Sequence, residues 1–143
     1  MRQSATGGGQ SVDMLALAAI YSEATRAQPG VEDVPTVWRA AGPGKHTIRV
    51  CFEAPLDIRR IRLRFSEHVE ERTQEFALSW SDSLDALPTQ LVRQQWNFSP
   101  TGSTEEVEDY AVDLKGVRCL ELEIVPDIRG GGAFATVTEW RVS

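Results

Sequence analysis

The stretch that decides the fold runs from residue 46 to residue 65 and reads HTIRVCFEAPLDIRRIRLRF. Ile48, Val50 and Phe52 alternate with polar or charged side chains, and after a short link that contains a proline the same period resumes through 61–65. Strict alternation is typical of a strand with one buried face and one face in water. The stretch therefore predicts two neighbouring amphipathic strands.

The same period of two recurs along the rest of the chain, in the runs 75–80, 109–114 and 119–124. The dipeptide Lys115-Gly116 predicts a tight hairpin between the last two of these runs. The final run, 133–142, changes parity part-way, which predicts a β-bulge. Together these patterns predict an all-β chain, an antiparallel β-sandwich of the jelly-roll type with about eight strands.

The N-terminal part of the chain is less decisive. Residues 1–12 are small, polar and rich in glycine, so we expect a disordered segment followed by a single domain over 13–143. Residues 12–27 fit either a helix with an apolar stripe or an extended strand. No signal peptide is recognisable, so the sequence predicts a cytoplasmic protein.

Composition excludes several classes of function. The formal net charge of −6 argues against nucleic acid as a partner, because phosphate binding usually needs a basic surface. No apolar run approaches the roughly 20 residues of a membrane helix, so no membrane partner is expected. With two His and two Cys, a Cys/His zinc site is not expected. We predict neither a metal nor a cofactor.

Cys51 and Cys119 both fall on the polar parity of their runs. Two cysteines do not make a disulfide scaffold, so reduced thiols are the favoured interpretation and a disulfide is the alternative.

Arginines and acids occupy the outward positions of the predicted strands. Arg49, Arg60, Arg62 and Arg64 could form a basic stripe that binds an anion. The favoured interpretation is a solvated face with cross-strand pairs of opposite charge, each contributing roughly 0.2–1 kcal/mol.

A family resemblance appears when these segments are taken in order. A Thr-x-Trp at 36–38 is followed by the apolar strand, the Pro-containing link and the alternating strand, and the runs EFALSWS (75–81) and LELEI (120–124) come later. This order resembles the discoidin (coagulation-factor C-type) and galactose-binding-like jelly-roll family over residues 14–142. The resemblance implies a first strand near 15–22, which favours extended structure there. It also implies ligand binding by loops at one end of the sandwich.

If the strands run up and down, the loops 29–46, 66–74, 99–105 and 126–133 share one end, and the links 54–57, 82–89 and 115–117 share the other. Sugar recognition needs planar polar groups and an aromatic face. The first end offers such groups, and we predict a ligand site made of Glu67, His68, Glu71, Arg72, Trp96, Asp127 and Arg129. The alternative interpretations, which are favoured for these residues taken singly, place Trp96 and Phe98 in the core and leave His68 merely solvated.

No nucleophile elbow, catalytic triad or phosphate-binding glycine motif is recognisable, so we do not expect an enzyme. The sequence favours a non-catalytic carbohydrate-binding module that recognises a glycan. The alternative is an intracellular protein-interaction module or a subunit of a larger assembly. The sequence leaves the oligomeric state open and does not separate a sugar from a protein ligand.

Overall fold

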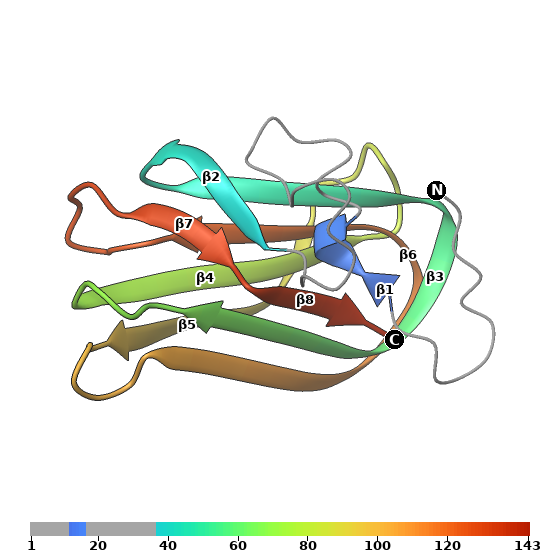
Figure 1. Cartoon of the computed structure of the whole chain (residues 1–143). Coiled ribbons are helices and arrows are strands. Elements are labelled where there is room, and N and C mark those ends of the chain that lie inside the picture. Colours follow the sequence, from blue (N-terminus) through green and yellow to red (C-terminus); the bar gives the residue numbers. More distant parts are fainter. Residues whose placement is uncertain (1–11, 17–36) are drawn as a thin grey trace, which may run out of the picture.

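A computed structural model describes residues 12–16 and 37–143, and the chain is an antiparallel β-sandwich (Figure 1). This confirms the predicted fold class. The eight strands are β1 (Val12–Asp13), β2 (Trp38–Pro43), β3 (His46–Ser66), β4 (Arg72–Ser81), β5 (Thr89–Phe98), β6 (Glu105–Val125), β7 (Phe134–Val137) and β8 (Glu139–Val142).

One folded sheet supplies both layers of the sandwich. Six strands hydrogen-bond in the order β1-β8-β3-β6-β4-β5, and β2 and β7 form a separate two-stranded sheet. The first part of β3 and the last part of β6 lie beside β4 and β5, whereas the other halves of β3 and β6 lie beside β8. Both long strands curve back on themselves at one end of the molecule (Figure 1).

The curve in β3 and β6 corrects one sequence prediction. Lys115-Gly116 does not close a hairpin, because β6 continues through it from Glu105 to Val125. The register between β3 and β6 shifts three times between Cys51 and Arg60. Gly116 has a φ of +66° at this bend, a conformation that suits glycine. The sequence therefore correctly indicated a change of chain direction at Lys115-Gly116, but this change is a bend within one strand and not a hairpin between two.

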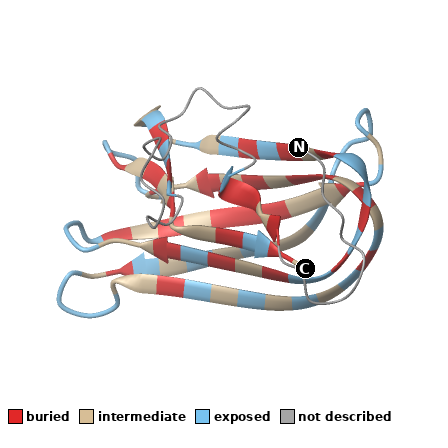
Figure 2. Ribbon diagram, turned by 45° about the vertical axis from the view of Figure 1, so that its right-hand side comes forward, coloured by how far each residue is buried: buried red, intermediate tan, exposed pale blue. Residues whose placement is uncertain are grey.

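The predicted inward parity matches the observed core. The side chains of Ile48, Val50, Leu63, Phe65 and Leu122 are all at most 4% exposed. Trp38 and Trp140 lie in the same core, as expected. Figure 2 shows the resulting alternation of buried and exposed residues along each strand.

The parity change in the last run is a change of sheet. Ala135 and Val137 are buried from β7, which pairs with β2. The chain then passes Thr138, whose backbone N–H and hydroxyl both donate to the carbonyl of Arg64, at 2.9 and 2.8 Å. Trp140 and Val142 are buried from β8, which pairs with β3. The predicted bulge is thus a break between two strands.

The described part of the N-terminal segment is only partly extended. Val12 pairs with Val142, so it already belongs to the domain, and residues 1–11 lie outside the described residues. A helical turn covers residues 14–16, where Asp13 Oδ1 accepts from the N–H groups of Leu15 and Ala16 as an N-cap. The predicted first strand near 15–22 is therefore wrong at residues 15–16, and its remainder lies outside the described residues.

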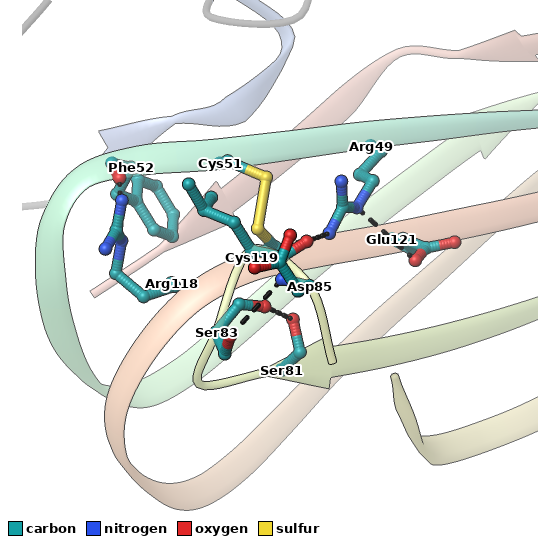
Figure 3. Close-up of a disulfide and its surroundings, with 10 residues drawn as sticks. Arg49, Cys51, Phe52, Ser81, Ser83, Asp85, Arg118, Cys119 and Glu121 are labelled. Atoms are coloured by element: carbon teal, nitrogen blue, oxygen red, sulfur yellow. Dashed lines mark hydrogen bonds and ion pairs between the residues drawn. A yellow bond between two sulfur atoms is a disulfide. The ribbon is translucent and has the colours of Figure 1, made fainter. Parts of the chain in front are cut away.

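The two cysteines form a disulfide, which corrects the expectation of reduced thiols (Figure 3). Cys51 of β3 lies directly opposite Cys119 of β6, with their Cα atoms 4.1 Å apart. The sequence spacing of 68 residues gave no indication of this pairing. Arg49, two residues before Cys51, donates to the carbonyl of Leu84 at 2.8 Å and holds the β4–β5 loop over the bridge.

The outward arginines are paired with acids, as favoured from the sequence. Arg60 hydrogen-bonds Asp109 through both oxygens of its carboxylate. Arg64 lies 2.6 Å from Glu105, and Arg49 lies 3.6 Å from its register partner Glu121. These contacts match the cross-strand pairing of a solvated sheet face.

Within the described ranges, no helix has the length and apolar character needed to cross a membrane.

Candidate functional site

Three of the loops predicted to form the site lie at one end of the sandwich, opposite the bend in β3 and β6 (Figure 1). The N–H of Glu67 donates to the carbonyl of Thr104 at 2.8 Å, which joins the loop 67–71 to the loop 99–104. The N–H of Ile128 donates to the carbonyl of Thr73 at 2.9 Å, which joins the loop 126–133 to the start of β4. We call these three loops the rim.

Arg72 holds the rim together from inside the protein. Its side chain is 2% exposed and lies over the ring of Phe98, 4.9 Å from the ring centroid. The guanidinium donates to Glu67 at 2.7 Å, to Gln74 at 3.3 Å and to the carbonyl of Pro126 at 2.6 Å. Because all these contacts are internal, Arg72 positions the loops and does not face a ligand, which corrects its predicted role.

Glu67 also has a structural role in its loop. Its carboxylate accepts from Arg72 and from the backbone N–H groups of Val69 and Glu70. Burial alone would raise the pKa of Glu67, but these hydrogen bonds outweigh it and hold the pKa below its usual value. The carboxylate is thus ionised and largely engaged in closing the turn.

Asp127 and Arg129 are placed together, as predicted. Asp127 accepts from the N–H of Arg129 at 3.1 Å, and its carboxylate lies 3.6 Å from the guanidinium of Arg129. Gly130 and Gly131 both have φ near +90°, which few other residues adopt, so the turn depends on them. The side chain of Arg129 is 65% exposed and can reach a ligand.

His68 and Glu71 are exposed at the tip of the loop 67–71, where they flank Val69, which is 81% exposed. On the neighbouring loop, Ile128 is 45% exposed. The rim therefore offers polar groups beside small apolar surfaces, the combination that a sugar ring can contact.

A hollow of about 260 Å³ opens at the same end, between the turn that joins β2 to β3 and the loop 126–133. Asp127 lines it together with Gly44, Lys45 and Gly130. The sequence analysis placed the loop 29–46 at this end but did not select Lys45. The sequence signal that could have indicated Lys45 is its position next to Gly44, in a short turn that is rich in glycine.

Trp96 is not at the rim, which corrects its predicted role. It lies on β5 opposite Gln74, packs against the core and has its indole N–H buried. The alternative interpretation of this residue, as core, is the one that holds.

A hollow of about 520 Å³ lies on the outer face of the other layer. Its charged walls are already paired: Arg64 with Glu105, and Arg141 with both Asp13 and Glu139. These ion pairs engage the arginines of this hollow with acids of the chain itself, so we place the candidate site at the rim.

Comparisons with known proteins identify the fold. No family model and no curated protein matches the chain. Among solved structures, the chain is similar to CpGH89CBM32-4 from Clostridium perfringens, which was determined in complex with glcNAc-alpha-1,4-galactose. The TM-score is 0.52 at 14% identity, and the match covers 98% of this chain and 99% of the other.

This chain shares that module's fold. The neighbour is a carbohydrate-binding module of the discoidin and galactose-binding-like type. At 14% identity the likeness shows the fold alone.

Proposed function

We propose that the protein is a non-catalytic carbohydrate-binding module of the discoidin and galactose-binding-like family, and that it binds a glycan at the rim. The observation that carries the proposal is the set of rim loops fixed by Arg72, which presents His68, Glu71 and Arg129 beside the exposed apolar side chains of Val69 and Ile128. The likeness to a module that binds a disaccharide supports it at the level of fold.

A glycan array followed by titration of the hits, monitored by amide chemical shifts, tests the proposal. We expect millimolar or tighter binding, with shifts concentrated in 67–71 and 126–132. Arg129→Ala and His68→Ala should each weaken binding at least fivefold. Asp85→Asn is the matched control, because Asp85 is exposed in the loop at the opposite end. No binding at millimolar glycan, or shifts confined to 82–88, would overturn the proposal.

The second candidate is a protein-interaction module. The observation that favours it is the β4–β5 loop at the opposite end, where Leu87 is 91% and Leu84 is 48% exposed. A pull-down from the native host with the wild-type chain and with Leu87→Ser tests it. A stoichiometric partner that the variant loses would support this function.

The disulfide bears on where the protein works. Cytoplasmic localisation stays a prediction from the sequence, whereas a disulfide favours an oxidising compartment. We infer such a compartment, and a count of free thiols on protein from the native source tests this. Two reactive thiols in the native protein would contradict the inference.

A further inference from the structure

The disulfide lies at the free side of its layer. Cys51 belongs to residues 46–51 of β3, which pair only with β6 among the described strands, so this half of β3 is an edge strand. Cys119 of β6 lies between Cys51 and Ser81 of β4. These three residues form one row across the layer, and Cys51 is its outer member (Figure 3).

The two sulfur atoms of the bridge differ in access. Cys119 is 1% exposed, since β4 lies on its other side and the loop 82–88, which follows Ser81, is bonded to Arg49 beyond it. Cys51 is partly exposed and, with its neighbours in β3, lines a hollow of about 360 Å³. A thiolate breaks a disulfide by attacking one of its sulfur atoms, and access decides which one. Attack is therefore open at Cys51.

The surroundings of Cys51 suit a protein as the attacking reagent. Arg49 and Glu53 both line the hollow, so its wall carries charges of both signs and repels neither kind of surface. An edge strand presents backbone N–H and C=O groups that an extended segment of another protein can pair. Residues 46–51 form such an edge beside the sulfur atom.

The bridge also fixes the position of the β4–β5 loop. Residues 46–51 pair in regular register with 119–124, and the register then shifts three times before Arg60. The disulfide therefore closes the regular part of the ladder, and without it hydrogen bonds alone hold the end of this edge strand. Arg49, two residues before the bridge, donates to the carbonyl of Leu84 at 2.8 Å. Movement of this strand end thus moves the anchor of the loop.

We propose that Cys51 is a site of thiol–disulfide exchange with a protein dithiol, and that reduction of the bridge releases the β4–β5 loop while the rest of the domain stays folded. One thiolate of the dithiol attacks Sγ of Cys51 and displaces Cys119, which leaves as a thiolate and takes up a proton. The second thiolate of the dithiol then attacks its own partner sulfur in the mixed disulfide, and Cys51 leaves and takes up a proton. The bridge gains two electrons and two protons, and the dithiol loses both and becomes a disulfide.

A dithiol completes this reaction where a monothiol does not. Cys119 stays directly opposite Cys51, with the Cα atoms 4.1 Å apart, so it can attack the mixed disulfide and expel the incoming thiol. A second thiol carried by the same reductant competes with this return. The exchange is independent of glycan binding, because the rim lies at the opposite end of the sandwich (Figure 1).

Reduction of the oxidised full chain by dithiothreitol at pH 7.5, followed by mass after alkylation, tests the attack. We expect the rate to change less than twofold between 0 and 1 M urea, because the folded protein is attacked. A larger increase would show that reduction requires unfolding, and the proposal would fail. After a short reaction with glutathione and a quench with N-ethylmaleimide, peptide maps should place the glutathione on Cys51. Glutathione on Cys119, or none on Cys51, would also contradict the proposal.

Amide relaxation by NMR tests the release of the loop. On reduction, the order parameters of 83–87 should fall below about 0.6, whereas those of 61–65 and 74–78 should stay near about 0.85. Unchanged values at 83–87, or a fall throughout the domain, would overturn the proposal.

Two variants test whether Arg49 transmits the change. Arg49→Gln should lower the order parameters of 83–87 in the oxidised chain, and reduction should then lower them little further. Arg64→Gln is the matched control: Arg64 is on the same strand, is 44% exposed against 42% for Arg49, and likewise pairs with an acid of β6. It should leave the loop of the oxidised chain unchanged. Equal effects of the two variants would contradict the role of Arg49.

Discussion

Arg72 is the residue on which the rim depends, because its guanidinium contacts the loop 67–71, the loop 126–133 and β4. Replacing it with methionine would leave Glu67 without its cation and the carbonyl of Pro126 without its donor. We expect Arg72→Met to lower the free energy of unfolding by about 3 kcal/mol, measured by urea denaturation.

Arg129→Met is the matched control for this prediction. Its guanidinium is 65% exposed, so the free energy of unfolding should change by less than about 0.5 kcal/mol. Equal losses in both variants would show that the buried contacts of Arg72 carry no special weight.

Glu106 should make the stability fall as the pH rises. Its pKa is about 9 in the folded protein, above the ordinary 4.5, so the folded state retains a proton that the unfolded state loses between these values. The stabilising effect is complete below pH 4.5 and is lost as the pH rises toward 9, with a slope of up to about 1.4 kcal/mol per pH unit. Glu106→Gln should flatten the profile measured by urea denaturation at pH 5, 7 and 8.5.

Other carboxylates act in the opposite direction at lower pH. Hydrogen bonds hold the pKa of Glu67 below its usual value, so its contribution is present at neutral pH and is lost as the pH falls through the folded pKa. A steep slope between pH 5 and 8.5 that Glu106→Gln does not change would assign the dependence to another group.

The residue types indicated which polar groups the site could offer. They did not indicate which of these side chains are engaged in hydrogen bonds inside the protein. Asp127 and Arg129 are two residues apart in sequence and contact each other. Arg72 and Glu67 carry equally suitable groups, yet they are bonded to each other and to the backbone. The partner that decides the role of Arg72 is the carbonyl of Pro126, which is distant in sequence and invisible to a local pattern.

At the scale of elements, the disulfide joins β3 to β6 at the start of their bend. It closes a separation of 68 residues, for which the chain-entropy estimate is about 4 kcal/mol. We expect the double variant Cys51→Ala/Cys119→Ala to lose about 2–4 kcal/mol of unfolding free energy, by urea denaturation without reductant.

Reductant provides the control for the disulfide. It should destabilise the wild-type chain by a similar amount and leave the double variant unchanged. A wild-type chain whose midpoint does not move once thiol titration shows complete reduction would contradict this account.

Strand parity was readable because each residue's face depends on its immediate neighbours. Ile48, Val50 and Phe52 could be placed inside from their alternation alone. The bend at 115–116 was not readable as a bend, because a hairpin and a curved strand use the same glycine chemistry. The switch at Thr138 likewise depends on a distant carbonyl, that of Arg64.

At the scale of the whole molecule, the central pairing joins distant parts of the chain, since His46 pairs with Ile124 and Ser66 with Glu105. Long-range pairing of this kind slows folding. We expect the reduced protein to refold in milliseconds to seconds, followed by tryptophan fluorescence in stopped-flow urea dilution. Refolding within microseconds would contradict the dominance of this pairing.

The curvature of β3 and β6 also governs what the rim can accommodate. Since both strands turn back, one pair of strands carries the attachment points of all three rim loops and of the β2–β3 turn (Figure 1). The distances between these attachment points are consequently fixed by the fold before a ligand binds. A glycan that spans these loops would meet a preorganised surface and lose little affinity to rearrangement, and one of the wrong dimensions could not be accommodated by loop adjustment.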